Sequence, residues 1–191
     1  RPMKRLLLFL LLTPLAAQAE LPVASIFAAS TGAWEGELYY LDYQSNQRFG
    51  IPMRVEAETT PDGVTLIRRL TFTDPGVLVH AVNLITVDRD TGELVESYFR
   101  EGKGQLFRYT IDSVRFDDIE NWELVYSEEG VDDDKPAQLR HTLKREGNTL
   151  SGSLLEQEHA LLAPVAGPDQ QRLADLLREN LVPLDGTQAP G

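Results

Sequence analysis

The sequence predicts an all-β protein, an antiparallel up-and-down β-barrel of about nine strands followed by a C-terminal α-helix. Three observations lead to this fold class. Turn-forming residues recur at an even interval between residues 44 and 148, the segments between them alternate polar and apolar side chains, and these segments are about ten residues long. The chain has 191 residues and is 42% hydrophobic, which is typical of one folded domain.

The first segment, residues 1–19, has the pattern of a secretory signal peptide. Lys4 and Arg5 precede the unbroken apolar run Leu6–Leu12, and small residues occupy the cleavage positions in Ala17–Ala19. The apolar run is too short to cross a bilayer as a helix. We therefore expect cleavage after residue 19 and a mature chain that begins at residue 20.

Composition limits where the protein acts and what it binds. The chain has no cysteine, which excludes disulfides, thiolate metal sites and cysteine nucleophiles. Its formal net charge of −12 repels the phosphates of nucleic acids, so we expect no nucleic-acid partner. A cysteine-free, acidic and exported chain is typical of a periplasmic or secreted protein of a bacterial envelope. We expect no integral membrane insertion after signal cleavage.

The mature chain is predicted to contain an apolar N-terminal segment, residues 20–31, and then a barrel domain, residues 32–160. Strands of this length in an open sheet would leave two exposed edges, and closure into a barrel removes them. A β-sandwich is the main alternative, although its strands are usually shorter. The runs that we expect to form strands are Trp34–Tyr43, Arg48–Glu58, Val64–Thr73, Val77–Asp88, Glu93–Glu101, Gln105–Phe116, Asn121–Glu128, Gln138–Arg145 and Thr149–Gln157.

The C-terminal part differs in pattern. Leucines recur at helical spacing within Asp169–Val182, Asp169 is a suitable N-cap, and Pro183 follows the last apolar position. We therefore expect a linker and helix over residues 161–183. The remaining residues 184–191 are expected to form a disordered tail.

One short motif resembles a known family. Gly32-Ala33-Trp34 opens the first expected strand, and it is similar to the Gly-x-Trp signature of lipocalins and related calycin barrels, especially exported bacterial members. The resemblance implies that Trp34 closes the barrel floor and that a basic residue of the last strands, Arg140 or Lys144, covers its ring by a cation–π contact. The family's Thr-Asp-Tyr motif and its disulfide are absent.

Candidate ligand-binding residues are polar or aromatic side chains that alternation places beside apolar ones. We select Arg68 on the face of Leu66 and Leu70, and His80 and His141 between apolar neighbours. An arginine on an apolar inner face suits a ligand carboxylate, and a salt bridge is the alternative. The tyrosines selected for the same reason are Tyr40 and Tyr109.

No catalytic or metal site is predicted. Gly-x-Ser-x-Gly is absent, and the three histidines are not spaced as a ligand pair. Asp88–Glu93 resembles the start of a calcium loop but lacks the glutamate at its twelfth position, so a hairpin turn is favoured. The cofactor is left open, because an inward histidine also suits haem iron.

The sequence therefore favours an exported protein that binds a hydrophobic or amphipathic small molecule in a barrel lumen. The first alternative is a non-enzymatic envelope protein with a packed barrel and a protein partner. The second is an enzyme that uses carboxylates and tyrosines at the barrel mouth. An outer-membrane barrel is disfavoured, because charged residues on both strand faces interrupt the lipid-facing belt it would need.

Overall fold

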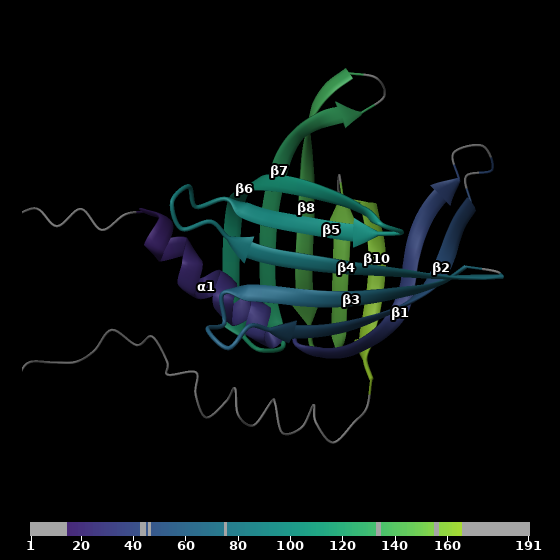
Figure 1. Ribbon diagram of the computed structural model, residues 1–191, viewed down its shortest axis with the longest axis horizontal. Helices are drawn as coiled ribbons and strands as arrows, with labels where there is room; N and C mark the ends of the chain where they lie inside the picture. The colour runs from purple at the N-terminus through teal and green to yellow at the C-terminus, as the bar shows by residue number, and fades with distance from the viewer. Residues whose placement is uncertain are drawn as a thin grey trace, which may run out of the picture.

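The computed structural model describes residues 15–42, 45, 47–74, 76–132, 135–154 and 157–165. These residues form one α-helix and ten β-strands, and the strands curl into a barrel with the helix at one end (Figure 1). The elements are α1 (Leu15–Ala29), β1 (Gly32–Asp42), β2 (Gln47–Thr59), β3 (Thr65–Asp74), β4 (Val77–Val87), β5 (Leu94–Arg100), β6 (Lys103–Asp118), β7 (Asn121–Asp132), β8 (Lys135–Glu146), β9 (Thr149–Leu154) and β10 (Gln157–Pro164).

The sheet is closed, and each strand pairs antiparallel with its sequence neighbours. The order around the barrel is β1-β10-β9-β8-β7-β6-β5-β4-β3-β2. Closure is made by β1, in which Trp34 is paired with Val55 of β2 on one side and with Pro164 of β10 on the other. The predicted all-β barrel is thus confirmed, and every strand bonds on both sides, so the sheet has no free edge.

The structure has ten strands rather than the expected nine. Where one last strand was expected over Thr149–Gln157, the structure has two, β9 and β10. The chain reverses after Leu154 and returns as β10, which extends the barrel to Pro164. No Gly, Asn or Pro marks this reversal in the sequence, so the usual turn signal is missing. The helix predicted within residues 161–183 and the tail at 184–191 lie outside the described residues, apart from the end of β10 and Val165.

Helix α1 closes one end of the barrel. Val23, Ile26 and Phe27 are buried in the core beneath the strands. The helix ends where Ser30 N and Ser30 Oγ both donate to the carbonyl of Ile26, and Gly32 then takes a φ of 115° that turns the chain into β1. No helix in the described part of the chain is long and apolar enough to span a bilayer.

Alternate residues of each strand face the lumen, as a period of two requires. Near α1 the inward side chains are large and packed, and Trp34, Trp122, Leu66, Leu94 and Leu124 are all at most 2% exposed. The opposite end is where the hairpins β1–β2, β3–β4, β5–β6 and β7–β8 turn (Figure 1). We call this end the mouth, and the α1 end the floor.

Candidate functional site

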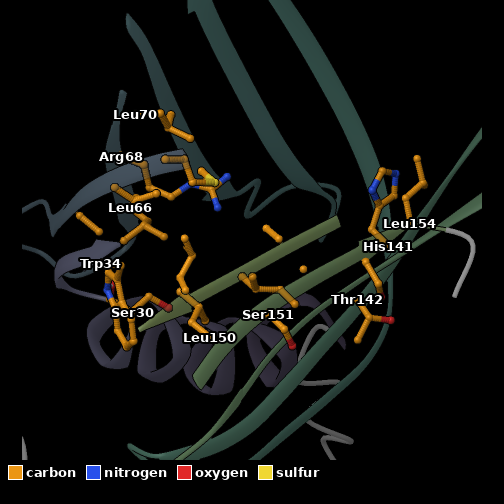
Figure 2. Close-up of a pocket in the computed structure, with 18 of the residues that line it drawn as sticks. Ser30, Trp34, Leu66, Arg68, Leu70, His141, Thr142, Leu150, Ser151 and Leu154 are labelled. Carbon is orange, nitrogen blue, oxygen red and sulfur yellow. The ribbon is translucent and has the colours of Figure 1, made fainter. Parts of the chain in front are cut away.

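The lumen contains a cavity of about 350 Å³ between the packed floor and the mouth. Its walls come from strands on opposite sides of the barrel, with Arg68 of β3 facing His141 of β8 across the space (Figure 2). The cavity is apolar toward α1 and polar at mid-height, where Arg68, Tyr126 and His141 line it. The principal apolar lining residues are Trp34, Val55, Leu66, Leu150 and Leu162.

On one wall, Arg68 belongs to a four-residue network across β3 to β6. Its Nε donates to Asn83 Oδ1 at 2.9 Å, and its Nη2 lies 3.6 Å from Glu96 Oε1. Asn83, which is 1% exposed, donates through Nδ2 to the same carboxylate oxygen. Tyr109 donates to the other oxygen, Glu96 Oε2, at 3.3 Å. The guanidinium charge of Arg68 is therefore balanced within the wall.

On the other wall, the rings of Tyr126 and Tyr109 lie against the ring of His141. The ring of Tyr126 stacks on that of His141, with centroids 5.0 Å apart and planes at 1°. Tyr109 meets both rings edge-on, at 4.9 Å from Tyr126 and 5.2 Å from His141. Tyr109 thus joins this aromatic group to the Arg68 network, so that the two walls form one polar belt at mid-lumen.

Three polar groups of this belt have unusual surroundings: His141 Nε2 and the hydroxyls of Tyr126 and Tyr109. His141 Nε2 lies 3.4 Å from Glu128 Oε1 but has no hydrogen-bond partner, although it is buried. The two atoms are thus close together but are not aligned as a hydrogen bond. Burial raises the pKa of Tyr126 to about 12; the Glu96 carboxylate adds to this rise, the Arg68 guanidinium opposes it, and Glu128 adds to it. Burial, then the charge of Glu96, also raises the pKa of Tyr109.

The structure brings together three of the five predicted ligand residues: Arg68, Tyr109 and His141. His80 is not among them, because it occupies the outer face of β4, where it is exposed and its Nδ1 lies 3.2 Å from Thr71 Oγ1. The expectation that His80 points inward is corrected. The backbone of Tyr40 pairs with Phe49 in the β1–β2 ladder, and its side chain lies outside the described residues.

Sequence reasoning missed the partners that complete the belt. Asn83 and Glu96 are polar residues at inward positions of β4 and β5, and their neighbours in the sequence do not distinguish them from outward polar residues. Tyr126 and Glu128 share the inward face of β7 with Leu124. In the sequence, Trp122, Leu124 and Tyr126 alternate with Glu123 and Ser127, and this alternation indicates the inward face of β7.

The Trp34 motif adopts a closing position at the floor. The indole is 1% exposed, and its Nε1 donates to the carbonyl of Ser30 at 2.9 Å. The cation over its ring is Arg145, at 5.1 Å from the centroid, rather than Arg140 or Lys144. Those two residues lie on the outer face of β8, and Arg140 is exposed, because residues of even number in β8 point away from the lumen.

The acidic loop that resembled a calcium site is a hairpin turn. Asp88 Oδ1 accepts from the backbone nitrogens of Asp90 and Thr91, and Gly92 N donates to Asp88 O at 2.7 Å. Arg108 bridges Asp88 and Glu93 across the turn. Within the described ranges, no three His, Asp or Glu side chains converge to hold a metal ion.

Comparison with known proteins does not assign the chain to a family. No family model matches the chain, and no curated protein matches it. Among solved structures, the chain is similar to the crystal structure of Rv2717c from M. tuberculosis, at 16% sequence identity and a TM-score of 0.45, over 80% of this chain and 99% of that one. The barrel assignment therefore rests on the strand register and closure of this chain itself.

Proposed function

We propose that this protein is an exported barrel that binds a small amphipathic molecule in its lumen. The observation that carries the proposal is the cavity of about 350 Å³, which is within the size range of ligand pockets. Protein cores are normally packed without such voids.

The lining indicates an amphipathic ligand. The apolar half next to α1 suits a hydrocarbon or ring system, while Arg68, Tyr126 and His141 place hydrogen-bonding groups at the other half. His141 Nε2 is buried without a hydrogen-bond partner, which is costly unless a ligand or water satisfies it. A packed barrel with only a protein partner would leave both features without a reason.

An enzymatic role has less support. A general base needs a pKa near the working pH, whereas the pKa of Tyr126 is raised to about 12 and that of Tyr109 is also raised. These hydroxyls therefore stay protonated at neutral pH. We assign them to ligand contact and packing.

Export is proposed from the signal pattern, and the position of Pro22 in α1 supports it. In a helix that begins at Leu15, Pro22 is an interior residue, where it removes a backbone hydrogen bond. Cleavage after Ala19 would place Pro22 in the first turn, where its missing N–H costs nothing. The buried residues Val23, Ile26 and Phe27 would all remain in the mature protein.

The test is native mass spectrometry of the mature protein purified from the periplasm of its own host. A bound molecule of reproducible mass is expected. A matched pair of variants then locates it. Gly152→Leu adds a side chain inside the cavity, where a Cβ would meet only the Cβ of Ala160 at 4.0 Å, and Thr73→Leu places the same leucine side chain at an exposed position of β3.

We expect Gly152→Leu to remove the bound mass and Thr73→Leu to retain it. Purified protein that carries nothing, and that takes up nothing from a panel of apolar amines, alcohols, acids and haem, would overturn the proposal. A ligand retained in full by folded Gly152→Leu protein would place binding outside this cavity.

A further inference from the structure

We propose that the lumen selects an amphipathic amine, whose protonated head lies beside Glu128 and the rings of Tyr126 and His141 and whose apolar part extends toward α1. This inference rests on the proposed lumenal binding, and it names the chemical class of the ligand. It differs from the carboxylate expected from Arg68 alone.

The first step is that Arg68 is not available to an anion. Its Nε is bonded to Asn83, its Nη2 lies 3.6 Å from Glu96, and only 23% of its side chain is exposed. A ligand carboxylate here would have to displace Glu96 or lie next to it, and like charges in a desolvated site repel strongly. The network on this wall therefore disfavours an anionic head.

The second step is the charge that remains. Within the described belt, Arg68 is balanced by Glu96, and Glu128 is a second carboxylate on the inner face of β7. The contact of Glu128 with His141 is 3.4 Å long and lacks hydrogen-bond alignment. Glu128 is thus the carboxylate of the belt that lies beside no arginine or lysine of the belt. Burial is the largest cause of the raised pKa of Tyr126; Glu96 adds to the rise, Arg68 opposes it, and Glu128 adds to it.

The third step is the aromatic surround. The rings of Tyr126, His141 and Tyr109 lie within 5.2 Å of one another by their centroids. Cations bind over aromatic rings, and the attraction grows when the site is desolvated. An ammonium head would also donate to Glu128, and it would lie beside the buried His141 Nε2, which has no hydrogen-bond partner.

The fourth step is the field of the whole chain. A formal net charge of −12 raises the concentration of cations near the surface and speeds their association. It has the opposite effect on fatty acids and other anionic amphiphiles. The long-range charge and the local site therefore favour the same head group.

The experiment compares three probes with the same chain: decylamine, decanol and decanoate, titrated into the mature protein by calorimetry at neutral pH and low salt. We expect decylamine to bind at least about tenfold more tightly than decanol, a difference of about 1.4 kcal/mol, and decanoate to bind most weakly. Glu128→Gln should abolish the preference for the amine. Glu129→Gln, the exposed neighbour on the outer face, is the matched control and should keep the preference.

A second variant predicts a gain of binding. Glu96→Gln removes the charge that balances Arg68, so decanoate affinity should rise about tenfold while decanol affinity stays constant and reports an intact fold. Tightest binding of decanoate by the unchanged protein would overturn the amine assignment but leave lumenal binding in place. Binding of none of the three probes would overturn lumenal binding itself. An amine preference unaffected by Glu128→Gln would contradict the placement of the ammonium head beside Glu128.

Discussion

The guanidinium of Arg145 lies over the indole of Trp34, 5.1 Å from the ring centroid. The same side chain donates through Nη1 to the carbonyl of Ala29 at 3.1 Å and through Nε to that of Gly147 at 2.9 Å. Arg145 therefore ties three parts of the floor together: the end of α1, the β8–β9 turn and the first strand. Burial lowers the pKa of Arg145, and the charges of Glu120 and Asp118 oppose that shift.

Replacement of Arg145 by alanine is expected to lower the free energy of unfolding by about 2–4 kcal/mol. The substitution removes the cation–π contact, worth about 1 kcal/mol, and leaves the Ala29 carbonyl without its donor. Urea denaturation checks this value. Arg140→Ala, an exposed arginine of the same strand, should change stability by no more than about 0.5 kcal/mol. Equal losses for the two variants would show that the Trp34 contact is not stabilising.

The period-two alternation of β8 is enough to predict from the sequence that Arg145 is the arginine that contacts Trp34. Leu139, His141 and Leu143 alternate with polar residues and so form one face of their strand, and Arg145 continues that face at the next alternate position. Arg140 and Lys144 belong to the other face. The family resemblance indicated a basic residue near the end of the barrel, and strict period-two counting would have selected the one that contacts Trp34.

The same alternation does not predict which face of β4 the side chain of His80 occupies. Strand β4 has apolar residues on both faces, and Leu78 and Val82 on the outer face are 63% and 40% exposed. Apolar neighbours therefore did not identify the inner face. The buried set of β4 instead includes Asn83, a polar residue that is inward because partners on β3 and β5 satisfy it. Such partnerships depend on strand register, which spacing along one strand cannot supply.

Asn83 is expected to be the most sensitive polar residue of the belt. Asn83→Ala should lower the free energy of unfolding by about 2–4 kcal/mol, because it leaves the Arg68 guanidinium and the Glu96 carboxylate without a shared buried partner. Asn121→Ala, which removes an exposed amide bonded to Asp118, is the control and should cost about 1 kcal/mol or less. Thermal unfolding of both variants provides the comparison, and a loss at Asn83 no larger than at Asn121 would argue against a cooperative network.

Gly32 is expected to be required for the passage from α1 to β1. Its φ of 115° is strained for any residue with a Cβ, so Gly32→Ala should lower stability by about 1–3 kcal/mol. Gly152 has no positive φ, and an added Cβ there would only touch Ala160. Gly152→Ala should therefore be neutral or slightly stabilising. Chemical denaturation distinguishes the two, and a neutral Gly32→Ala would mean that the entry into β1 adjusts without cost.

Alkaline pH should destabilise the protein through the buried tyrosines. Burial raises the pKa of Tyr126 to about 12, above the value of about 10 in an unfolded chain. Between these values the unfolded state has lost the proton that the folded state keeps, so the stability present below pH 10 falls as pH rises. Between about pH 9 and pH 11, the contribution of Tyr126 to the free energy of unfolding falls by about 1 kcal/mol.

The variant that tests this linkage is Tyr126→Phe. It keeps the ring that stacks on His141 and removes the ionisable hydroxyl, so the fall in unfolding free energy between about pH 9 and pH 11 should shrink by about 1 kcal/mol. The titration of tyrosinate absorbance should in parallel lose a component near pH 12. Tyr109, whose pKa burial also raises, still contributes its own fall in the variant. An unchanged pH dependence in Tyr126→Phe would mean that the hydroxyl ionises freely, and hence that the belt at mid-lumen is open to water.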